Sequence, residues 1–330
     1  MTSPRVSVVM PVFNVAPYVA EAVQSVLDQT FPDFELVIVD DGSSDESIAI
    51  CRTFDDPRIR IVHQQNRGLA GARNTGIAAA RGDLIALLDS DDRWSPEKLR
   101  LHVIHLDADA SVGVSYSGSR FIDADGTVLK QVQRPRLDDV APHHILCRNP
   151  VGNGSAAVIR RAALDRIMYT DAGEPHHPRY FDESFRQSED IELWIRMSLT
   201  SGYRFDGIAP LLTDYRIISG GLSANIARQF ESWERVIDKV RSYAPEFIEQ
   251  HGAAARAYQL RYLARRSVQL GDGSFALSLI GEALSASRLP LWQEPRKTLL
   301  TLAAALVTRM CSPGLSRRVA RRWSGGKVMA

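Results

Sequence analysis

The chain has 330 residues, of which 45% are hydrophobic and 24% are charged, and its formal net charge is +1. This is the composition of a soluble globular protein, and the nearly neutral charge gives no reason to expect a nucleic-acid partner. The three cysteines are odd in number and far apart, which fits neither a disulfide framework nor a zinc site and favours a reducing cytoplasm. The N-terminus has no signal-peptide pattern, and no segment reaches the roughly 18 apolar residues of a membrane span.

The first hundred residues alternate between patterns typical of strands and patterns typical of helices. Strands are predicted at Val6–Val12, Phe34–Val39, Ile59–His63 and Asp83–Asp89, and helices at Tyr18–Gln29, Ser44–Phe54, Leu69–Ala80 and from about Pro96, behind an N-cap at Ser95. The strands are apolar on both faces, which is typical of a parallel sheet covered by helices on both sides. The predicted fold class is therefore α/β, with a Rossmann-like, mostly parallel sheet.

The second half of the sequence has a mixed pattern. Strands are predicted at Val112–Ser117 and Ser155–Ile159, a hairpin at Phe121–Leu129 around the turn Asp125-Gly126, and an amphipathic helix at Ser188–Leu199. After Asn225 the strand patterns end, and the remaining residues are typical of helices interrupted at Gly271–Gly273, Pro290 and Pro313. We therefore predict an α/β domain at residues 1–225 and a helical C-terminal region with a basic tail at residues 226–330.

Two acidic clusters follow predicted strands. Asp40 and Asp41 come after the second strand, and Asp89, Asp91 and Asp92 follow the apolar run LIALL. Because the carboxyl ends of parallel strands emerge at one edge of a sheet, both clusters are expected there. Taken alone, the second cluster is most simply a solvated turn beside a helix N-terminus, a role that suits Asp92. The alternative is that Asp89 and Asp91 hold a divalent cation completed by water and phosphate.

The first acidic cluster has more carboxylates than a strand-to-helix turn requires. Asp40 and Asp41 can accept hydrogen bonds from a nucleotide base or a ribose hydroxyl. Between the two clusters, the segment NRGLAGARN has glycines that allow close approach to the backbone, and its Arg73 can pair with phosphate. The dinucleotide fingerprint G-x-G-x-x-G is absent, which argues against a dehydrogenase.

Three stretches of the sequence resemble the family 2 glycosyltransferases of GT-A fold. They are VSVVMPVFNVAPYVAEAVQSVLDQTFPDFELVIVDDGSSDES, NRGLAGARNTGIAAARGDLIALLDSDDRWSPEKL and SEDIELWIRM, which occur in the family's order over residues 5–220. The resemblance implies inverting transfer of a sugar from a nucleotide diphosphate, with a UDP-sugar favoured, and a Mn²⁺ or Mg²⁺ cofactor. It also implies a glycan or lipid-linked acceptor, in surface polysaccharide, lipopolysaccharide or glycan synthesis. Non-processive transfer is expected, because ELWIRM replaces the glutamine-x-x-arginine-tryptophan motif of processive synthases.

The resemblance assigns the nucleotide site to residues of the first half of the chain. Asp41 would accept a hydrogen bond from the donor base, with Asp40 beside it. Pro11 and Phe13 would line the base pocket. Arg73 falls where the family places a basic contact to the nucleotide.

The resemblance assigns the chemistry to three carboxylates. Asp89 would meet the ribose or the metal shell, and Asp91 would bind the cation that bridges the diphosphate. Asp190 falls on the family's catalytic base, and inverting transfer needs a carboxylate that accepts the proton of the acceptor hydroxyl. Without the resemblance, Asp190 is equally well explained as compensating the dipole of a helix N-terminus.

Other features leave alternatives open. The pairs His143-His144 and His176-His177 fit solvated loops better than metal sites, and Trp194 fits the core. The segment YRIISGG, residues 215–221, fits a mobile lid over the diphosphate or a connector to the helical region.

The C-terminal end of the chain is basic. Residues 309–330 contain six basic residues and no acid, and they follow the apolar run TLLTLAAALV. This fits a tail on an anionic membrane surface, and thus a cytoplasmic enzyme that is peripheral at the inner face of the membrane. It also fits a core helix followed by a disordered basic end.

Two other classes of protein share parts of this pattern. A sugar-phosphate nucleotidyltransferase needs a glycine-rich loop with arginine and lysine after the first strand, and PVFNVAPY has none. A non-catalytic nucleotide-sugar-binding or scaffold protein could have the same fold. The presence of Asp41, Asp89, Asp91 and Asp190 together argues against that second class.

Overall fold

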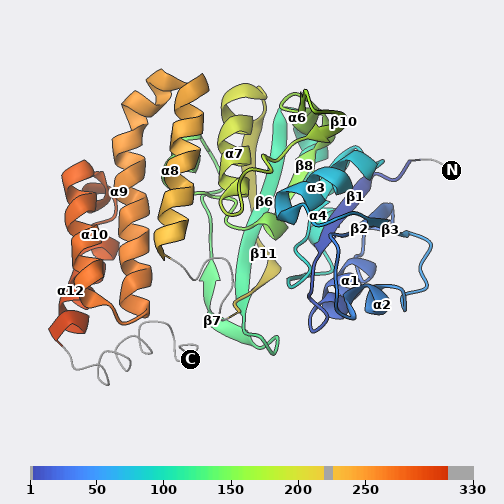
Figure 1. The fold of residues 1–330 in the computed structure, drawn as a ribbon, viewed down its shortest axis with the longest axis horizontal. Coiled ribbons are helices and arrows are strands. Elements are labelled where there is room, and N and C mark those ends of the chain that lie inside the picture. Colours follow the sequence, from blue (N-terminus) through green and yellow to red (C-terminus); the bar gives the residue numbers. More distant parts are fainter. Residues whose placement is uncertain (1–2, 219–225, 311–330) are drawn as a thin grey trace. The chain divides into compact units, whose positions relative to one another are not determined.

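The structure, a computed structural model, describes residues 3–218 and 226–310. The chain divides into two compact units, which we call the sheet unit (residues 1–142 and 150–217) and the helical unit (residues 143–149 and 218–330). Figure 1 shows the sheet with its helices and the separate group of helices α8 to α12. None of the described helices is both long enough and apolar enough to cross a membrane.

The sheet unit is built on a nine-stranded sheet with the order β3-β2-β1-β4-β8-β6-β11-β5, and β7 beside β6. Strands β3, β2, β1 and β4 are parallel to one another, β8 is antiparallel to both β4 and β6, and β6 and β11 are parallel. The strands are β1 Val6–Val12, β2 Phe34–Asp40, β3 Ile59–His63, β4 Leu84–Leu87, β5 Arg93–Trp94, β6 Val112–Ile122, β7 Val128–Gln133, β8 Ala157–Arg160 and β11 Arg204–Arg216. A separate hairpin is formed by β9 Tyr169–Asp171 and β10 Glu174–Arg179.

Helices cover both faces of the parallel part of the sheet. Alternate side chains of β1, such as Val8 and Met10, pack in one core cluster with Val23 of helix α1, whereas Val39 of β2 packs with Ala72 of helix α3 in another. The helices of this unit are α1 Val19–Leu27, α2 Ser47–Cys51, α3 Gly68–Ala79, α4 Lys98–Ala108, α6 Arg161–Asp165 and α7 Glu189–Thr200, with a 3-10 turn at Gly154–Ala156. The predicted α/β fold, with a sheet that is apolar on both faces, is therefore confirmed.

One predicted helix start is wrong. Helix α4 begins at Lys98 rather than near Pro96, and Ser95 is not its N-cap. The reason is the short strand β5, in which Trp94 pairs with Thr213 of β11. The backbone N–H of Ser95 continues this pairing by donating to the carbonyl of Leu212 at 3.0 Å. The segment between the acidic cluster and α4 is therefore part of the sheet.

Strand β11 is the largest element that the sequence pattern does not predict. It runs for 13 residues beside β6, although it contains Gly207 and Pro210. Gly207 pairs in register with Tyr116, and register shifts between Ile208 and Thr213 absorb Pro210, which is how irregular strands accommodate a residue without a backbone donor. The histidine pair at 176–177, predicted in a loop, lies in β10, and Trp194 is buried in the core as predicted.

The helical unit consists of α-helices around one apolar cluster. The helices are α5 Pro142–Cys147, whose residues from His143 on belong to this unit, α8 Ile226–Tyr243, α9 Pro245–Gln269, α10 Gly273–Ala286, α11 Leu289–Gln293 and α12 Pro295–Met310. Leu260, Leu263 and Ile280 are at the centre of the cluster. The predicted interruption at Gly271–Gly273 is confirmed, whereas the one predicted at Pro290 lies at residues 287–288, because proline fits the first turn of α11. Pro313 lies outside the described residues.

Candidate active site

The carboxyl ends of β2, β1 and β4 bring the two acidic clusters to one edge of the sheet. Val12 at the end of β1 pairs with Asp40 of β2, and Val9 of β1 pairs with Leu87 at the end of β4. Both flanking strands are parallel to β1, so the residues that follow them emerge on the same side (Figure 1). The predicted placement of the two clusters at a common edge is confirmed.

Asp41 is buried and fixed by the loop that begins α3. One carboxylate oxygen accepts hydrogen bonds from the backbone N–H of Arg67 and the side-chain amide of Gln64, both at 2.7 Å. The other accepts from the backbone N–H of Gly68 at 2.9 Å. Gly68 has a φ of +78°, a backbone conformation that other residues rarely adopt. The loop is therefore shaped around the Asp41 carboxylate.

The other residues predicted at the nucleotide site lie around Asp41. Burial acts to raise the pKa of Asp40, but hydrogen bonds from Ser43 and His63 lower it. Pro11 is buried in β1, and the side chain of Phe13, just beyond the end of that strand, is 48% exposed. The exposed ring at the edge of the sheet is available to a flat ligand.

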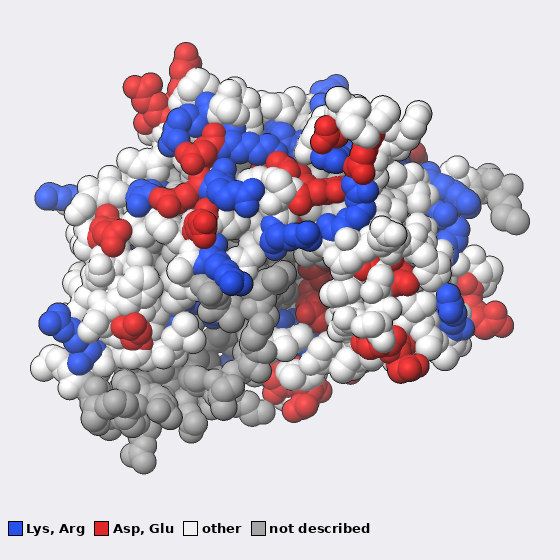
Figure 2. All heavy atoms as spheres, viewed as in Figure 1, with Lys and Arg blue, Asp and Glu red and all other residues white. Residues whose placement is uncertain are grey.

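A cluster of arginine and glutamate side chains connects the Asp41 loop to the β9–β10 hairpin. Arg67 donates to Glu174 of β10 at 2.6 Å and 3.1 Å and to Glu183 at 2.9 Å. His177, in the second predicted histidine pair, is 2.7 Å from Glu183 through Nε2. Figure 2 shows basic and acidic side chains in contact over the region of α3 and β10. The backbone N–H of Arg67 thus binds Asp41, whereas its side chain binds Glu174 and Glu183.

Arg73 is buried on α3 and pairs with two carboxylates. Its Nη2 lies 2.7 Å from Oδ1 of Asp89, and its Nη1 lies 2.8 Å from Oε1 of Glu189. Asp89, Glu189 and Asp190 together raise the pKa of Arg73 although burial opposes this, so the guanidinium is charged. The resemblance predicts a contact with the nucleotide for Arg73, and in the structure its guanidinium pairs with Asp89 and Glu189. Its partner Glu189 was missed, because no pattern in the sequence relates positions so far apart.

The cluster after β4 has three carboxylates in three different environments. Asp89 is ion-paired with Arg73, whereas no described basic side chain forms an ion pair with the Asp91 carboxylate. Burial and the neighbouring Asp89 raise the pKa of Asp91 to about 6. Asp92 is 1% exposed and accepts hydrogen bonds from Ser155 Oγ at 2.6 Å and from the backbone N–H of Arg216 at 2.8 Å. The predicted role of Asp92 at a helix start is therefore wrong, because β5 lies between it and α4.

Arg216, at the end of β11, holds the acidic loop in place. Its Nε donates to the carbonyl of Asp91 at 2.7 Å, and its Nη2 donates to Glu21 of α1 at 2.8 Å. Its Nη1 donates to the carbonyls of Asp123 and Ala124 in the β6–β7 turn. The sequence analysis placed Arg216 in a lid or connector; it is a buried anchor, and residues 219–221 of that segment lie outside the described residues.

Asp190 lies in the first turn of α7, next to Glu189. Burial and the Glu189 charge raise the pKa of Asp190 to about 7, and Arg73 acts against them. Its Oδ1 accepts a hydrogen bond from the backbone N–H of Ile191 at 2.8 Å. A carboxylate with a pKa near 7 can exchange a proton under physiological conditions. Through Glu189 and Arg73, Asp190 is connected to Asp89 and so to the acidic loop.

The residues present fit a divalent cation that is completed by a ligand. In the described parts of the chain, no three His, Cys, Asp or Glu side chains form a cluster able to hold a metal. The Asp91 carboxylate forms no ion pair with a described side chain, although the charge of Arg216 acts to lower its pKa. Together with Asp89 it offers too few oxygens for a site made of protein ligands alone. Mg²⁺ and Mn²⁺ prefer oxygen ligands, and Mg²⁺ usually keeps waters and binds substrate phosphates. This donor set therefore suits a cation brought together with a diphosphate.

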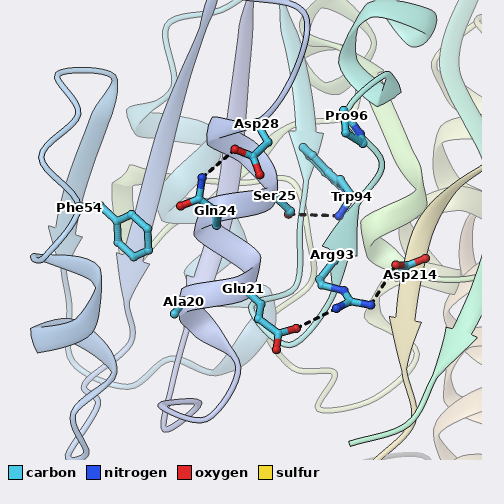
Figure 3. A pocket seen from close by; sticks show the side chains of 10 residues that line it. All are labelled: Ala20, Glu21, Gln24, Ser25, Asp28, Phe54, Arg93, Trp94, Pro96 and Asp214. Atoms are coloured by element: carbon cyan, nitrogen blue, oxygen red, sulfur yellow. Dashed lines mark hydrogen bonds and ion pairs between the residues drawn. The ribbon is translucent and has the colours of Figure 1, made fainter. Parts of the chain in front are cut away.

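A shallow hollow of about 520 Å³ lies beside α1 and does not include these residues. It is lined by Ala20, Glu21, Gln24, Ser25, Asp28, Phe54, Arg93, Trp94, Pro96 and Asp214. Figure 3 shows that Arg93 bridges Glu21 and Asp214 across its floor. Glu21, Arg93 and Asp214 are therefore paired with one another, Asp28 accepts a hydrogen bond from Gln24 at 2.7 Å, and the hollow contains none of the predicted site residues.

The pattern of glycosyl transferase family 2 matches residues 7–168. TuaG of Bacillus subtilis (strain 168), a glycosyltransferase whose name assigns it to teichuronic acid biosynthesis, is 31% identical over 229 residues, which are 67% of this chain and 82% of TuaG. The chain belongs to glycosyltransferase family 2, and it is an enzyme that transfers glycosyl groups.

Two solved structures match most of this chain. Residues 1–349 of S. aureus TarS, in complex with UDP-GlcNAc, give a TM-score of 0.57 at 16% identity and cover 92% of this chain and 91% of that one. The mannosyltransferase PcManGT from Pyrobaculum calidifontis, in complex with GDP-Man and Mn²⁺, gives 0.60 at 21% identity and covers 96% and 88%. The similarity establishes the GT-A fold that the sequence analysis predicted.

Proposed function

We propose that this enzyme transfers a sugar from a nucleotide diphosphate to an acceptor hydroxyl by metal-dependent, inverting and non-processive chemistry. The observation that carries the proposal is the chain of contacts from Asp89 through Arg73 to Glu189, beside Asp190. It links the acidic loop, where a diphosphate and cation fit, to a carboxylate with a raised pKa. Donor activation and proton removal therefore belong to one site.

The donor would lie at the edge formed by β2, β1 and β4. Asp41, fixed by three hydrogen bonds, would face the base, with Asp40 beside it and Pro11 and Phe13 against the ring. We expect a UDP-sugar, as in the TarS complex with UDP-GlcNAc, although PcManGT is in complex with GDP-Man. A nucleotide-sugar that binds only the folded chain raises its melting temperature.

Asp190 would act as the base of a single displacement. The acceptor oxygen bonds to the anomeric carbon, the bond from that carbon to the diphosphate oxygen breaks, and the hydroxyl proton passes to the Asp190 carboxylate. Attack on the face opposite the leaving group inverts the anomeric configuration. Arg73 pairs with both Asp89 and Glu189 and would hold the base and the acidic loop in fixed positions relative to each other.

The cation would be held by Asp91 with Asp89 nearby. When bound, Mn²⁺ or Mg²⁺ supplies Lewis-acid stabilisation of the departing diphosphate, worth several kcal/mol in such sites. Arg216 would support this role by fixing the carbonyl of Asp91 and the neighbouring Asp92. The Mn²⁺ in the PcManGT complex supports this proposal.

The acceptor would be a glycan or a lipid-linked glycan of a surface polysaccharide, lipopolysaccharide or related polymer. The name of TuaG supports this class, and ELWIRM after Asp190 supports the addition of one sugar at a time. We further propose that residues 1–225 carry the reaction on the cytoplasmic side, and that residues 226–330, with their basic end, associate with a membrane surface.

Isotope-labelled donors test the reaction. We expect release of free nucleotide diphosphate from UDP-GlcNAc, UDP-glucose or GDP-mannose, dependent on Mn²⁺ and abolished by EDTA. Asp91→Asn should lose the Mn²⁺ dependence together with most of the rate, and Asp190→Asn should lose transfer while still binding donor. Asp55→Asn, an exposed acid away from the edge, is the matched control.

Two outcomes would contradict the proposal. If Asp91→Asn retains the parent rate and the same response to Mn²⁺, the cation is not held there. If donors raise the melting temperature but no sugar is transferred or hydrolysed under any metal condition, the chain is a nucleotide-sugar-binding protein of the same fold.

A further inference from the structure

Helix α12 exposes its large apolar side chains and buries its small or polar ones. Thr298, Thr301, Ala304, Ala305 and Thr308 face the interior of the helical unit. On the outside, Leu299 and Leu300 are 54% and 58% exposed, and Met310 is 85% exposed. The exposed positions of the helix that carry apolar side chains, which we call the outer face, are Leu299, Leu300, Ala303, Leu306, Val307 and Met310.

The outer face is one continuous stripe. At about 100° per residue, its members fall within an arc of about 120°, and the buried positions fall on the opposite arc. Scattered exposed leucines are ordinary on protein surfaces, but a contiguous apolar patch marks a site of interaction. Trp292 of α11, the helix immediately before, is 78% exposed. Tryptophan with one apolar side and one polar N–H is suited to the boundary between lipid and water.

The charged side chains that α12 itself carries are all basic, although Lys297 pairs with Glu294 just before the helix. From Pro295 to the end of the chain there are 36 residues without a single Asp or Glu. The basic residues in this stretch are Arg296, Lys297, Arg309, Arg317, Arg318, Arg321, Arg322 and Lys327. Arg296, Lys297 and Arg309 are exposed at the two ends of α12. Long basic side chains at helix ends can direct their charge toward headgroups while their stems cover apolar surface.

We infer that the outer face of α12 lies in the surface of an anionic lipid bilayer, with Arg296, Lys297 and Arg309 at the two ends of the helix against the headgroups. An amphipathic helix with an apolar stripe and basic flanks binds in this way, through buried apolar area and electrostatic attraction. A second copy of this chain is a poorer occupant, because two such faces would bring like charges together. The inference names the surface through which the proposed membrane association would occur. It rests on the proposed function in one respect only, that a lipid-linked acceptor lies in the membrane.

Vesicle flotation of the full chain tests the inference. We expect the parent to float with vesicles of phosphatidylcholine and phosphatidylglycerol and to stay behind with phosphatidylcholine alone. In Leu300→Glu/Val307→Glu the bound fraction should fall at least about tenfold, because both carboxylates must stay in water. Leu270→Glu, at an exposed leucine at the end of α9, should float as the parent does. Thermal midpoints equal to that of the parent show that each variant is folded, and Leu300→Ser/Val307→Ser gives a milder replacement.

The inference would be overturned if the parent did not float with anionic vesicles. It would also be overturned if the double variant floated as well as the parent, or if Leu270→Glu lost as much binding as the double variant. A dimer that the double variant dissociates, without flotation of the parent, would assign the face to a second copy. Donor hydrolysis and transfer to a water-soluble acceptor should be unchanged in the double variant, so failure of the membrane inference and failure of the proposed reaction are read separately.

Discussion

The guanidinium of Arg73 lies 2.7 Å from the carboxylate of Asp89, and this pair joins helix α3 to the loop that follows β4. The same guanidinium reaches Glu189 at 2.8 Å, so the first turn of α7 is held against the same point. Three segments that are distant in sequence thus meet at one buried cation. Because the two carboxylates would repel each other without it, Arg73 sets the spacing of the site.

We predict that Arg73→Met destabilises the fold by about 3 kcal/mol, because it leaves two largely buried carboxylates without a cationic partner. Urea unfolding monitored by tryptophan fluorescence measures the change. Arg81→Met, at an exposed arginine, should change the free energy of unfolding by less than about 0.5 kcal/mol. Equal effects of the two substitutions would show that the Arg73 pairs do not support the fold.

Gly154 makes room for the same ion pair, and its replacement should disturb catalysis. A Cβ at this position would lie 2.4 Å from Nη2 of Arg73 and 3.2 Å from Oδ2 of Asp89, so Gly154→Ala must push these groups apart. We expect the rate of transfer to fall at least about tenfold, a sensitivity typical of positioned catalytic groups. Gly173→Ala, where nothing lies within 4 Å, is the control and should keep the parent kcat. A Gly154→Ala enzyme with parent kinetics would contradict the prediction.

The edge of the sheet was predictable from sequence for a physical reason. Doubly buried parallel strands need continuous apolar runs, and their carboxyl ends must share an edge. The apolar runs before Asp40 and Asp89 are therefore enough to predict that the two acidic clusters lie at the same edge, without any knowledge of contacts. The start of α7 near Asp190 was visible for the same kind of reason, because its apolar periodicity is local.

The partners of these acids were not predictable, because they come from pairing between distant segments. Glu189 is 116 positions from Arg73, and Arg216 reaches Asp92 from the end of a strand that contains glycine and proline. Asp92 was misplaced because Ser95 and Pro96 make an acceptable local helix start. The pairing of Trp94 with β11 outweighs that local preference.

The raised pKa of Asp190 predicts a pH-dependent rate. Burial and Glu189 place that pKa at about 7, and only the deprotonated carboxylate can accept the acceptor proton. At saturating Mn²⁺, kcat/KM for the acceptor should fall about tenfold per pH unit below 7 and level off above it. Glu189→Gln removes a charge that raises the pKa, so its acidic limb should lie at lower pH. A rate that is flat down to pH 5, or a limb that Glu189→Gln leaves in place, would contradict the assignment.

Lys98 is buried on α4 and should make stability depend on pH on the alkaline side. Its Nζ donates to the carbonyl of Ala156 at 2.9 Å and to Thr213 Oγ1 at 3.3 Å. Burial lowers its pKa from 10.5 to about 7, while the charge of Asp92 acts in the opposite direction. Between pH 7 and 10.5 the unfolded chain therefore binds more protons than the folded chain at this position. Lys98 therefore makes the free energy of unfolding rise with pH over this range, by at most about 1.4 kcal/mol per pH unit.

Lys98→Met isolates this contribution, since methionine fills a similar volume without a titrating group. Urea unfolding at pH 7, 8 and 9 should give a difference between parent and variant that shifts in favour of the parent as pH rises. Titrating groups away from Lys98 are common to both proteins and cancel in the difference, and His102, which is 3.5 Å from Nζ, has a pKa well below 6.5 because of its burial and so stays neutral over this range. Lys130→Met, at an exposed lysine of β7, should show no such trend. If the difference for Lys98→Met is constant over this range, Lys98 remains charged in the folded chain, and its hydrogen bonds to Ala156 and Thr213 must then compensate for the burial of the charge.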